Sequence, residues 1–325
     1  MLSRHHIRVV ALLLAAAAVL LAAACSGSET PAPATPQASV VALQEGLAPA
    51  QSGFADANGA RLYYEVYGEG EPLLLIMGLG ANHLGWAAQV PVYAREYQVI
   101  VFDNRGTGQS DFPEGVDYTI PLLADDAAAL LDFLGVDAAH VYGVSMGGMI
   151  AQELVLRHPD KVRSLILGAT SPGGPHAVPP DPQAIQALLE QGSAADRAVS
   201  PALLDVLFSP DYLAEHGSEV LQKFQSMADY PETSPEAYMA QLRAAARHDT
   251  YERLPDIAAP TLVLHGTDDP LLPVGNAHIL AERIPGAKLV LFEGARHGYM
   301  EKQAEADTAV LDFLHAHAQE GAASE

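Results

Sequence analysis

The chain has 325 residues, of which 49% are hydrophobic and 18% are charged, a composition typical of an ordered globular protein. Its 40 acidic and 17 basic residues give a formal net charge of −23. This charge argues against a nucleic-acid partner, because a polyanionic backbone requires a basic surface. The length favours one domain with an insertion over two independent domains.

The N-terminal residues 1–24 have the features of a signal peptide. Arg4 and Arg8 form a basic start, and residues 9–24 are an unbroken apolar run that ends directly before Cys25, the only cysteine. Residues 21–25 resemble the processing site of a bacterial lipoprotein, in which the cysteine is lipidated. The resemblance implies an exported protein that a lipid anchors to the membrane, facing the periplasm or the cell exterior. Ordinary signal-peptide cleavage, which would give a secreted soluble protein, is the alternative.

Residues 25–51 are rich in Pro, Ala, Ser and Thr, a composition that predicts a flexible tether. The pair Asn58-Gly59 then predicts a tight hairpin between strands at 53–56 and 61–66. Residues 319–325 are expected to form a disordered tail.

Beyond the hairpin, continuous apolar runs alternate with amphipathic stretches. The apolar runs suit strands that are buried on both faces of a parallel sheet, and they span 73–77, 99–102, 140–143, 165–167, 261–264 and 289–292. The predicted helices between and after them are 122–134, 149–157, 276–283 and 303–317. The alternation predicts an α/β fold with a mostly parallel central sheet flanked by helices.

Residues 171–254 interrupt this alternation, because they contain Pro and Gly pairs and helix-like runs but no buried strand. The predicted helices are 182–191, 201–208, 219–227 and 235–247. We interpret this segment as a helical cap inserted over the site, between core segments 52–170 and 255–318, while helices packed beside the sheet are the alternative. Apolar side chains in the cap favour an apolar acyl or alcohol group in the substrate, although packing between helices explains most of them equally well: Leu204, Leu207, Phe208, Tyr212, Phe224, Met227, Tyr230, Tyr238 and Met239.

Residues 143–147, Gly-Val-Ser-Met-Gly, are the most informative stretch, because a strand-like run leads into them and a helix-like run follows. Small residues around Ser145 allow the sharp turn that presents a nucleophilic hydroxyl above a sheet edge. A serine hydroxyl is a poor nucleophile unless a base takes its proton, so the hypothesis requires a histidine and an acid. Asp269 and His297 follow two later strands in the expected order, at the strand ends where parallel sheets place their sites.

Asp268 competes with Asp269 for the role of the acid. The spacing from His265-Gly266 favours Asp269, and His265 itself is interpreted as a structural residue at the strand end.

With these motifs in place, the chain from about Gly53 to His317 resembles the α/β-hydrolase fold family. Four segments carry the likeness besides the elbow at Ser145, namely 103–111, 158–162, 265–273 and 294–298. Within the family the chain is similar to small cap-bearing esterases and lactonases, such as 3-oxoadipate enol-lactonases and aclacinomycin methylesterases.

The resemblance implies a mechanism. Ser145 would attack an acyl carbonyl, His297 would take its proton, Asp269 would orient the imidazole, and water would then hydrolyse the acyl-serine. The backbone N–H groups of Met146 and Leu79 would form the oxyanion hole.

The loop that carries Leu79 departs from the family pattern. Many relatives begin this loop with His-Gly, whereas this chain has Met77-Gly78, so a hydrogen bond that braces the loop is expected to be absent.

The function that the resemblance implies is that of a cofactor-independent serine hydrolase acting on a carboxylic ester or lactone. C–C bond hydrolysis or cofactor-free perhydrolase or haloperoxidase activity on the same triad is one alternative, and a non-catalytic, tethered ligand-binding lipoprotein is another. Ser145 argues against dehalogenases and epoxide hydrolases, which need an aspartate at that position. The sequence predicts no metal and no nucleotide cofactor, because it has neither convincing ligand spacing nor a G-x-G-x-x-G loop between a strand and a helix.

A few polar residues near the predicted strand ends have two interpretations. Asn82, His83 and Trp86 are candidates for the border of the pocket, although a lone histidine near a loop is more often structural. Asp103 and Arg105 are interpreted as a structural turn and ion pair.

Overall fold

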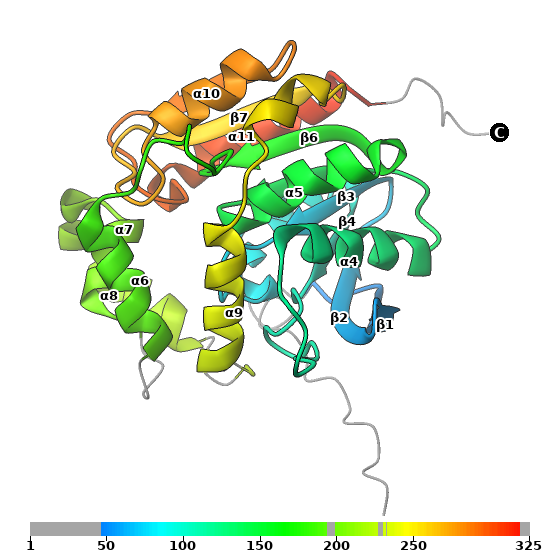
Figure 1. Cartoon of the computed structure of the whole chain (residues 1–325), viewed down its shortest axis with the longest axis horizontal. Helices are drawn as coiled ribbons and strands as arrows, with labels where there is room; N and C mark the ends of the chain where they lie inside the picture. The colour runs from blue at the N-terminus through cyan, green and yellow to red at the C-terminus, as the bar shows by residue number, and fades with distance from the viewer. Residues whose placement is uncertain (1–46, 194–198, 227–229, 232, 319–325) are drawn as a thin grey trace, which may run out of the picture. The chain divides into compact units, whose positions relative to one another are not determined.

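The computed structural model describes residues 47–193, 199–226, 230–231 and 233–318. Within these ranges eight strands form one sheet in the order β1-β2-β4-β3-β5-β6-β7-β8 (Figure 1). They are β1 (Gln51–Ala57), β2 (Ala60–Tyr67), β3 (Glu71–Ile76), β4 (Tyr97–Phe102), β5 (Ala139–Val144), β6 (Val162–Gly168), β7 (Thr261–Gly266) and β8 (Lys288–Phe292). The predicted signal peptide, the candidate lipidation site Cys25, the tether as far as residue 46 and the tail 319–325 lie outside the described residues.

Within the described sheet, β2 runs opposite to the other seven strands. β1 and β2 are antiparallel to each other, and β2 is antiparallel to β4, whereas every pair from β4 to β8 is parallel. The predicted α/β fold with a mostly parallel sheet is therefore confirmed.

The predicted hairpin is also present. Ala57 pairs with Ala60 in the register of β1 and β2. Asn58 and Gly59 between them have φ values of 46° and 80°, the left-handed conformation that a two-residue hairpin turn requires and that Asn-Gly adopts readily.

Helices cover both faces of the sheet. One face carries α4 (Ile120–Phe133), α5 (Met146–Arg157) and α10 (Gly275–Arg283), and the other carries η1 (His83–Trp86), α3 (Val90–Tyr93) and α11 (Gln303–His315). Neither η1 nor α3 is predicted from the sequence, and each has only four residues. A segment of that length shows too little of a 3.6-residue period to be recognised.

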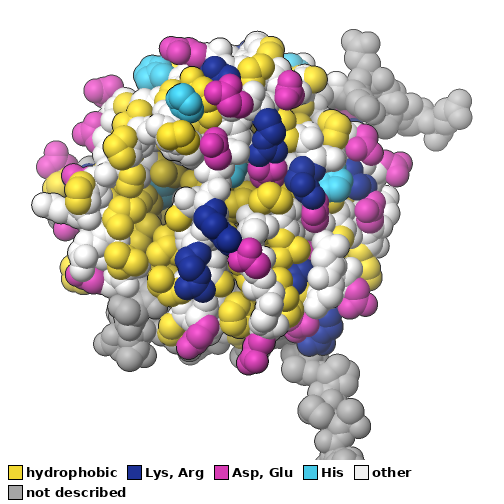
Figure 2. Space-filling view, in the orientation of Figure 1, with side chains coloured by type: hydrophobic (Ala, Val, Ile, Leu, Met, Phe, Trp, Pro, Cys, Tyr) yellow, Lys and Arg dark blue, Asp and Glu magenta, His cyan; other side chains and the backbone are white. Residues whose placement is uncertain are grey.

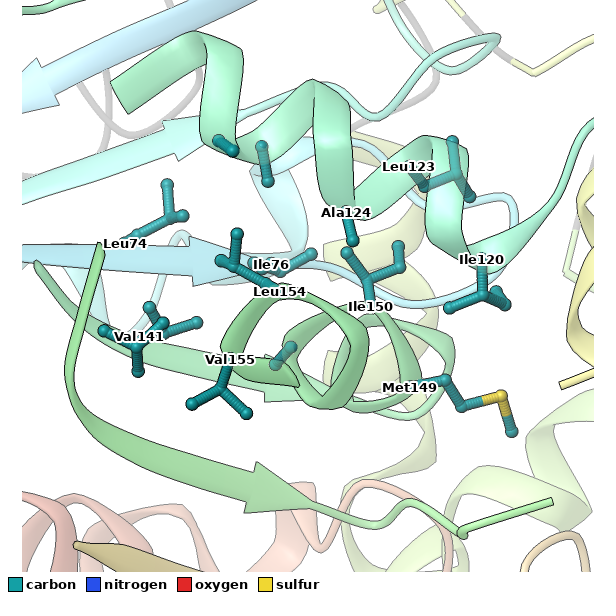
Figure 3. Packing of buried hydrophobic residues seen from close by; sticks show 14 of the residues in the cluster. Leu74, Ile76, Ile120, Leu123, Ala124, Val141, Met149, Ile150, Leu154 and Val155 are labelled. Carbon is teal, nitrogen blue, oxygen red and sulfur yellow. The ribbon is translucent and has the colours of Figure 1, made fainter. Parts of the chain in front are cut away.

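Successive side chains of β3 point to opposite faces of the sheet and so contribute to the hydrophobic core on each face. Leu74 and Ile76 belong to the cluster with α4 and α5, while Leu73 and Leu75 belong to the cluster with α3 and α11. Figure 3 shows Leu74 and Ile76 beside Leu154 of α5. All of these side chains are fully buried, and each such burial contributes about 2 kcal/mol to folding. Because β3 is buried on both faces, its position in the sheet is fixed, and with it the start of the loop that follows.

Residues 171–254, here termed the cap segment, leave the core after β6 and return before β7. Their helices are α6 (Pro182–Ser193), α7 (Pro201–Leu207), α8 (Pro210–Ser226) and α9 (Pro235–Ala246) (Figure 1). Helices α7 and α9 begin alike, because Ser200 and Ser234 cap them through their side chains and a proline follows each serine.

The predicted start of the third cap helix at residue 219 is wrong. Helix α8 begins at Pro210 and runs through Gly217. Ser209 accepts a hydrogen bond from the backbone N–H of Tyr212 at 3.3 Å, which caps this earlier start. Glycine lowers helix propensity by about 1 kcal/mol, and here the helix tolerates it.

The described residues contain no helix whose length and apolar character suffice to cross a membrane.

Candidate active site

The turn between β5 and α5 presents Ser145 in a strained conformation. Ser145 has φ 57° and ψ −123°, a region that costs a non-glycine residue on the order of 1–3 kcal/mol. Two hydrogen bonds hold it there: its N–H donates to Gly168 O at 2.9 Å, and its carbonyl oxygen accepts from Thr170 Oγ1 at 2.8 Å. The end of β6 thus fixes the turn that carries the hydroxyl.

Two glycines of the 143–147 motif are required by close backbone approach. A Cβ on Gly143 would overlap with the carbonyl oxygen of Gly147, and a Cβ on Gly147 would overlap with the carbonyl oxygen of Ile76 in β3. The spacing of the motif therefore follows from the packing of the start of α5 against β5 and β3.

The structure brings Ser145, His297 and Asp269 into one hydrogen-bonded relay. His297 Nε2 lies 3.0 Å from Ser145 Oγ, and His297 Nδ1 lies 2.8 Å from Asp269 Oδ2. Both the histidine and the aspartate are buried. With its proton on Nδ1, facing the carboxylate, the imidazole leaves the lone pair of Nε2 free to accept the proton of the serine.

The carboxylate of Asp269 is held on both oxygens. Asp269 Oδ1 accepts from the backbone N–H groups of Leu271 and Leu272 at 2.8 and 2.9 Å. Burial by itself raises the pKa of Asp269, but the imidazole of His297, with a further contribution from His265, holds that pKa well below its usual range. The group is therefore ionised at neutral pH, as the orienting acid must be.

The neighbouring polar residues of this loop make other contacts. Asp268 Oδ1 accepts from Thr267 Oγ1 at 3.0 Å, so the carboxylate that contacts His297 is that of Asp269. His265 Nε2 donates to Leu272 O at 2.6 Å and lies 3.3 Å from Asp269 Oδ2. His265 thus fixes the loop that holds the acid.

The loop after β3 lies against the nucleophile. A Cβ on Gly78 would stand 3.1 Å from Ser145 Cβ. Leu79 is the next residue of this loop, and Met146 is the first residue of α5, where backbone N–H groups have no acceptor within the helix. Backbone donors placed beside a serine hydroxyl are what an oxyanion hole requires.

This loop is braced although it begins with Met77 and not with a histidine. Asn104 Nδ2 donates to Met77 O at 2.9 Å, and Gln241 Oε1 of α9 accepts from Gly80 N at 3.0 Å. Thr233 Oγ1 of the cap segment donates to Gly80 O at 2.8 Å. The expectation concerned only the hydrogen bond that a histidine at position 77 would make; an asparagine after β4 and two cap residues brace the loop instead.

His83 belongs to a second buried cluster. His83 Nδ1 lies 2.7 Å from Asp103 Oδ1, and His83 Nε2 lies 3.5 Å from Glu65 Oε2. Tyr230 of the cap segment donates to Asp103 Oδ2 at 3.0 Å, and Tyr63 donates to Glu65 Oε1 at 2.8 Å. Burial by itself lowers the pKa of His83, but Asp103 and then Glu65 raise it to about 9, so the imidazole is charged at neutral pH.

We expect His83 to make the free energy of unfolding fall as the pH becomes alkaline. Its pKa is about 9 in the folded protein against 6.5 ordinarily. The stabilisation is therefore fully present below pH 6.5 and is lost as the pH rises through about 9, a change on the order of 3 kcal/mol. Urea unfolding of wild type and His83→Asn across this range should show a difference in free energy of unfolding that shrinks toward pH 9. His140→Asn is the matched control, because burial lowers the pKa of His140 and its loss should leave the alkaline decline unchanged.

The remaining candidates are structural. Asn82 caps η1 by accepting from Leu84 N at 3.0 Å, and the ring of Trp86 packs against Tyr142 with 4.9 Å between centroids. Arg105 forms an ion pair, as predicted, but its partner is Asp126 of α4, with two contacts of 2.7 Å. The sequence around Arg105 does not indicate Asp126 as its partner, because the two residues are 21 positions apart.

Several cap side chains named as pocket candidates pack against one another. Leu204, Phe208 and Val220 form one buried cluster, with Leu207, Tyr212 and Phe224 at its edge. Tyr238 of α9, in contrast, packs directly over Gly80 of the loop after β3. Met227 lies outside the described residues.

Sequence reasoning missed Thr170, Gln241 and Glu301, which contact the loops of the site. Thr170 follows directly after β6, where a polar residue is a usable signal. Gln241 stands in an ordinary helical run, and nothing in its local pattern marks it. In the part of the chain that the structure describes, no group of three or more His, Cys, Asp or Glu side chains is arranged to hold a metal ion.

The chain is similar to several known proteins. The profile of the alpha/beta hydrolase fold family matches residues 71–302. A putative carbamate hydrolase RutD of Caulobacter sp. strain K31 is 31% identical over 271 residues, which cover 81% of this chain and 98% of that protein. The pimeloyl-(acyl-carrier protein) methyl ester esterase of Aeromonas hydrophila is 30% identical over 240 residues, covering 72% and 91%. The enol-lactonase of Burkholderia xenovorans LB400 superposes with a TM-score of 0.71 at 28% identity, covering 81% and 100%.

Proposed function

Because the chain belongs to the alpha/beta hydrolase fold family, we propose that it is a cofactor-independent serine hydrolase that cleaves a carboxylic ester or lactone through an acyl-Ser145 intermediate. The observation that carries the proposal is the relay from Ser145 Oγ to His297 at 3.0 Å and from His297 to Asp269 at 2.8 Å. Binding alone requires no such relay.

In the acylation step, Ser145 Oγ attacks the carbonyl carbon while its proton passes to His297 Nε2. Asp269 stabilises the imidazolium that forms and keeps the ring in the productive tautomer. The negative oxygen of the tetrahedral intermediate accepts hydrogen bonds from the backbone N–H groups of Leu79 and Met146. When the intermediate collapses, the C–O bond to the leaving group breaks and the imidazolium returns its proton to the departing oxygen.

Deacylation reverses these roles with water as the nucleophile. His297 removes a proton from the water, the hydroxide adds to the acyl carbonyl, and Ser145 leaves with the proton of the imidazolium. In a lactone both products remain one molecule, a hydroxy acid.

The substrate class rests on the relatives and on the cap. The methyl ester esterase and the enol-lactonase support an ester-like substrate. Figure 2 shows hydrophobic side chains gathered around a hollow beside α9, on the side of α6, which supports an apolar group in the substrate. A carbamate is the second candidate substrate, since the match to the putative carbamate hydrolase covers 98% of the length of that protein.

The test combines labelling with turnover. A fluorophosphonate should label the native but not the urea-denatured protein, with the label at Ser145 in peptide mass mapping. Partial labelling should remove esterase activity in proportion to the serine modified. Purified protein should be assayed on p-nitrophenyl esters of increasing acyl length, methyl esters, lactones and aryl carbamates.

The outcomes separate the candidates. Turnover of esters and lactones but not carbamates supports the proposal, whereas preferential turnover of carbamates favours the second candidate. Labelling without any turnover leaves a competent nucleophile and refutes the substrate class. Absence of labelling refutes an activated serine and favours a ligand-binding module.

We further propose that the protein is exported and lipidated at Cys25, on the strength of the apolar run that ends at this residue. Metabolic labelling with an alkynyl fatty acid should mark the wild-type protein in a bacterial host but not Cys25→Ala. Release of the unlabelled wild-type protein as a soluble product would contradict this proposal.

A further inference from the structure

One carboxylate connects the loop of the catalytic histidine to the cap segment. Glu301 Oε1 accepts from the backbone N–H of Arg296 at 3.0 Å. Glu301 Oε2 accepts from Ser209 Oγ at 2.6 Å and from Ser209 N at 3.2 Å. Arg296 directly precedes His297, and Ser209 is the residue that caps α8. The two oxygens of Glu301 thus bind the neighbour of the base on one side and a corner of the cap on the other.

The same corner contacts the histidine directly. The backbone N–H of His297 donates to Val206 O at 3.2 Å, and the guanidinium of Arg296 donates to Asp205 O. Both carbonyl groups lie in the last turn of α7. We use the name cap corner for residues 205–209, the junction of α7 and α8. Every contact in this set joins the cap corner to residues 296–301.

A second anchor fixes the histidine loop on the side of the sheet. Tyr299 has φ 43° and is buried, and its hydroxyl lies 2.6 Å from the hydroxyl of Tyr142 in β5. Met300 packs against the apolar cluster of the cap that contains Leu204 and Phe208. The loop therefore runs between the strand that bears the nucleophile and the cap, and the cap side depends on Glu301.

From these contacts we propose that Glu301 is a positioning residue for His297, which makes the geometry of the catalytic base depend on the position of the cap corner. The inference rests on the proposed hydrolase function. A substrate that seats against the cap and shifts residues 205–209 changes the distance from His297 Nε2 to Ser145 Oγ. The cap thereby regulates the reactivity of the serine as well as enclosing the substrate.

The chemistry of the link explains why a carboxylate is needed. Each oxygen accepts from its own donors, so both must be acceptors at once. In Glu301→Gln one position becomes an NH₂ group that faces a donor, and one of the two connections is lost. Ser209→Ala removes only the hydroxyl connection and leaves the backbone N–H in place.

The experiment measures the rate at which a fluorophosphonate modifies Ser145, because this rate depends on the serine and its base but requires no knowledge of the substrate. We expect Glu301→Gln to lower it roughly 10- to 100-fold. Ser209→Ala should give a smaller loss, and the double variant should be little slower than Glu301→Gln alone, because both changes break the same link between the cap corner and Arg296. Glu305→Gln is the matched control: this carboxylate stands one turn further on, is 65% exposed and pairs with Lys302.

Two readouts separate positioning from loss of folded protein. The rate is expressed per serine that is finally labelled, so unfolded molecules do not lower it. The pH profile of labelling should also move in Glu301→Gln and Ser209→Ala, because the base is displaced, and should stay unchanged in Glu305→Gln.

Equal rates and profiles in Glu301→Gln and Glu305→Gln, or additive losses in the double variant, would overturn the proposal while leaving the hydrolase function intact. If Glu301→Gln fails to fold, Ser209→Ala decides, since an unchanged pH profile there contradicts the coupling. A wild-type protein that is not labelled refutes both proposals, because no activated serine then exists to be regulated.

Discussion

Replacement of Ser145 by alanine should lower kcat on the preferred ester by roughly 10⁴- to 10⁶-fold. In the proposed mechanism the hydroxyl oxygen is the attacking atom, and the structure places His297 Nε2 3.0 Å from it. Without Oγ no acyl-enzyme forms, and only attack by water assisted by His297 and the oxyanion donors remains. Steady-state assays with enzyme in large excess over any contaminating esterase would measure the loss, and KM should change little.

Ser171→Ala is the matched control for this change. Ser171 is buried close to the same turn, but its Oγ accepts from Gly173 N at 2.9 Å and takes no part in the relay. Its activity should stay within a few-fold of wild type, within the range of an ordinary polar substitution. Equal activity of wild type and Ser145→Ala would show that the esterase activity arises elsewhere.

Asp269→Asn should lower kcat by about 10⁴-fold with little change in KM. The amide oxygen can still accept from Leu271 N and Leu272 N, which now bind the carboxylate at 2.8 and 2.9 Å. The NH₂ group then faces His297 Nδ1 as a donor, so the imidazole adopts the tautomer with its proton on Nε2. In that tautomer Nε2 cannot accept the proton of Ser145.

The matched control is Asp268→Asn, which removes the same charge one residue earlier. Asp268 contacts Thr267 and not the histidine, so its rate should remain close to that of wild type. Parallel kcat measurements on both variants decide between the two carboxylates, and a larger loss in Asp268→Asn would contradict the relay seen here.

The fold and the central relay could be predicted because their signals are local. Asn58-Gly59 is sufficient for the hairpin, and the glycines around Ser145 reflect contacts within a few residues of the turn and with the adjacent β3. Asp269 and His297 follow recognisable strands, and parallel strands bring their ends to one edge without further information.

Long-range contacts between polar residues around the site could not be predicted in this way. Arg105 pairs with Asp126, and Tyr230 reaches Asp103 across 127 positions of sequence. Ser209 and Glu301 are 92 positions apart, and each stands in a stretch with an ordinary local pattern. The pairs Tyr230–Asp103 and Ser209–Glu301 depend on how the cap segment packs against the core, and Arg105–Asp126 depends on how α4 packs beside the loop after β4. No period or motif of one sequence encodes this packing.

Ser145 and His297 are far apart in the sequence, so the ribosome adds them at different times. Ser145 precedes His297 by 152 positions. At about 5–20 residues per second, the ribosome adds the base roughly 8–30 s after the nucleophile. If Ser145 acts as proposed, a nascent chain carries an unactivated serine throughout this interval, and a product of premature termination before β8 lacks the base that Ser145 requires.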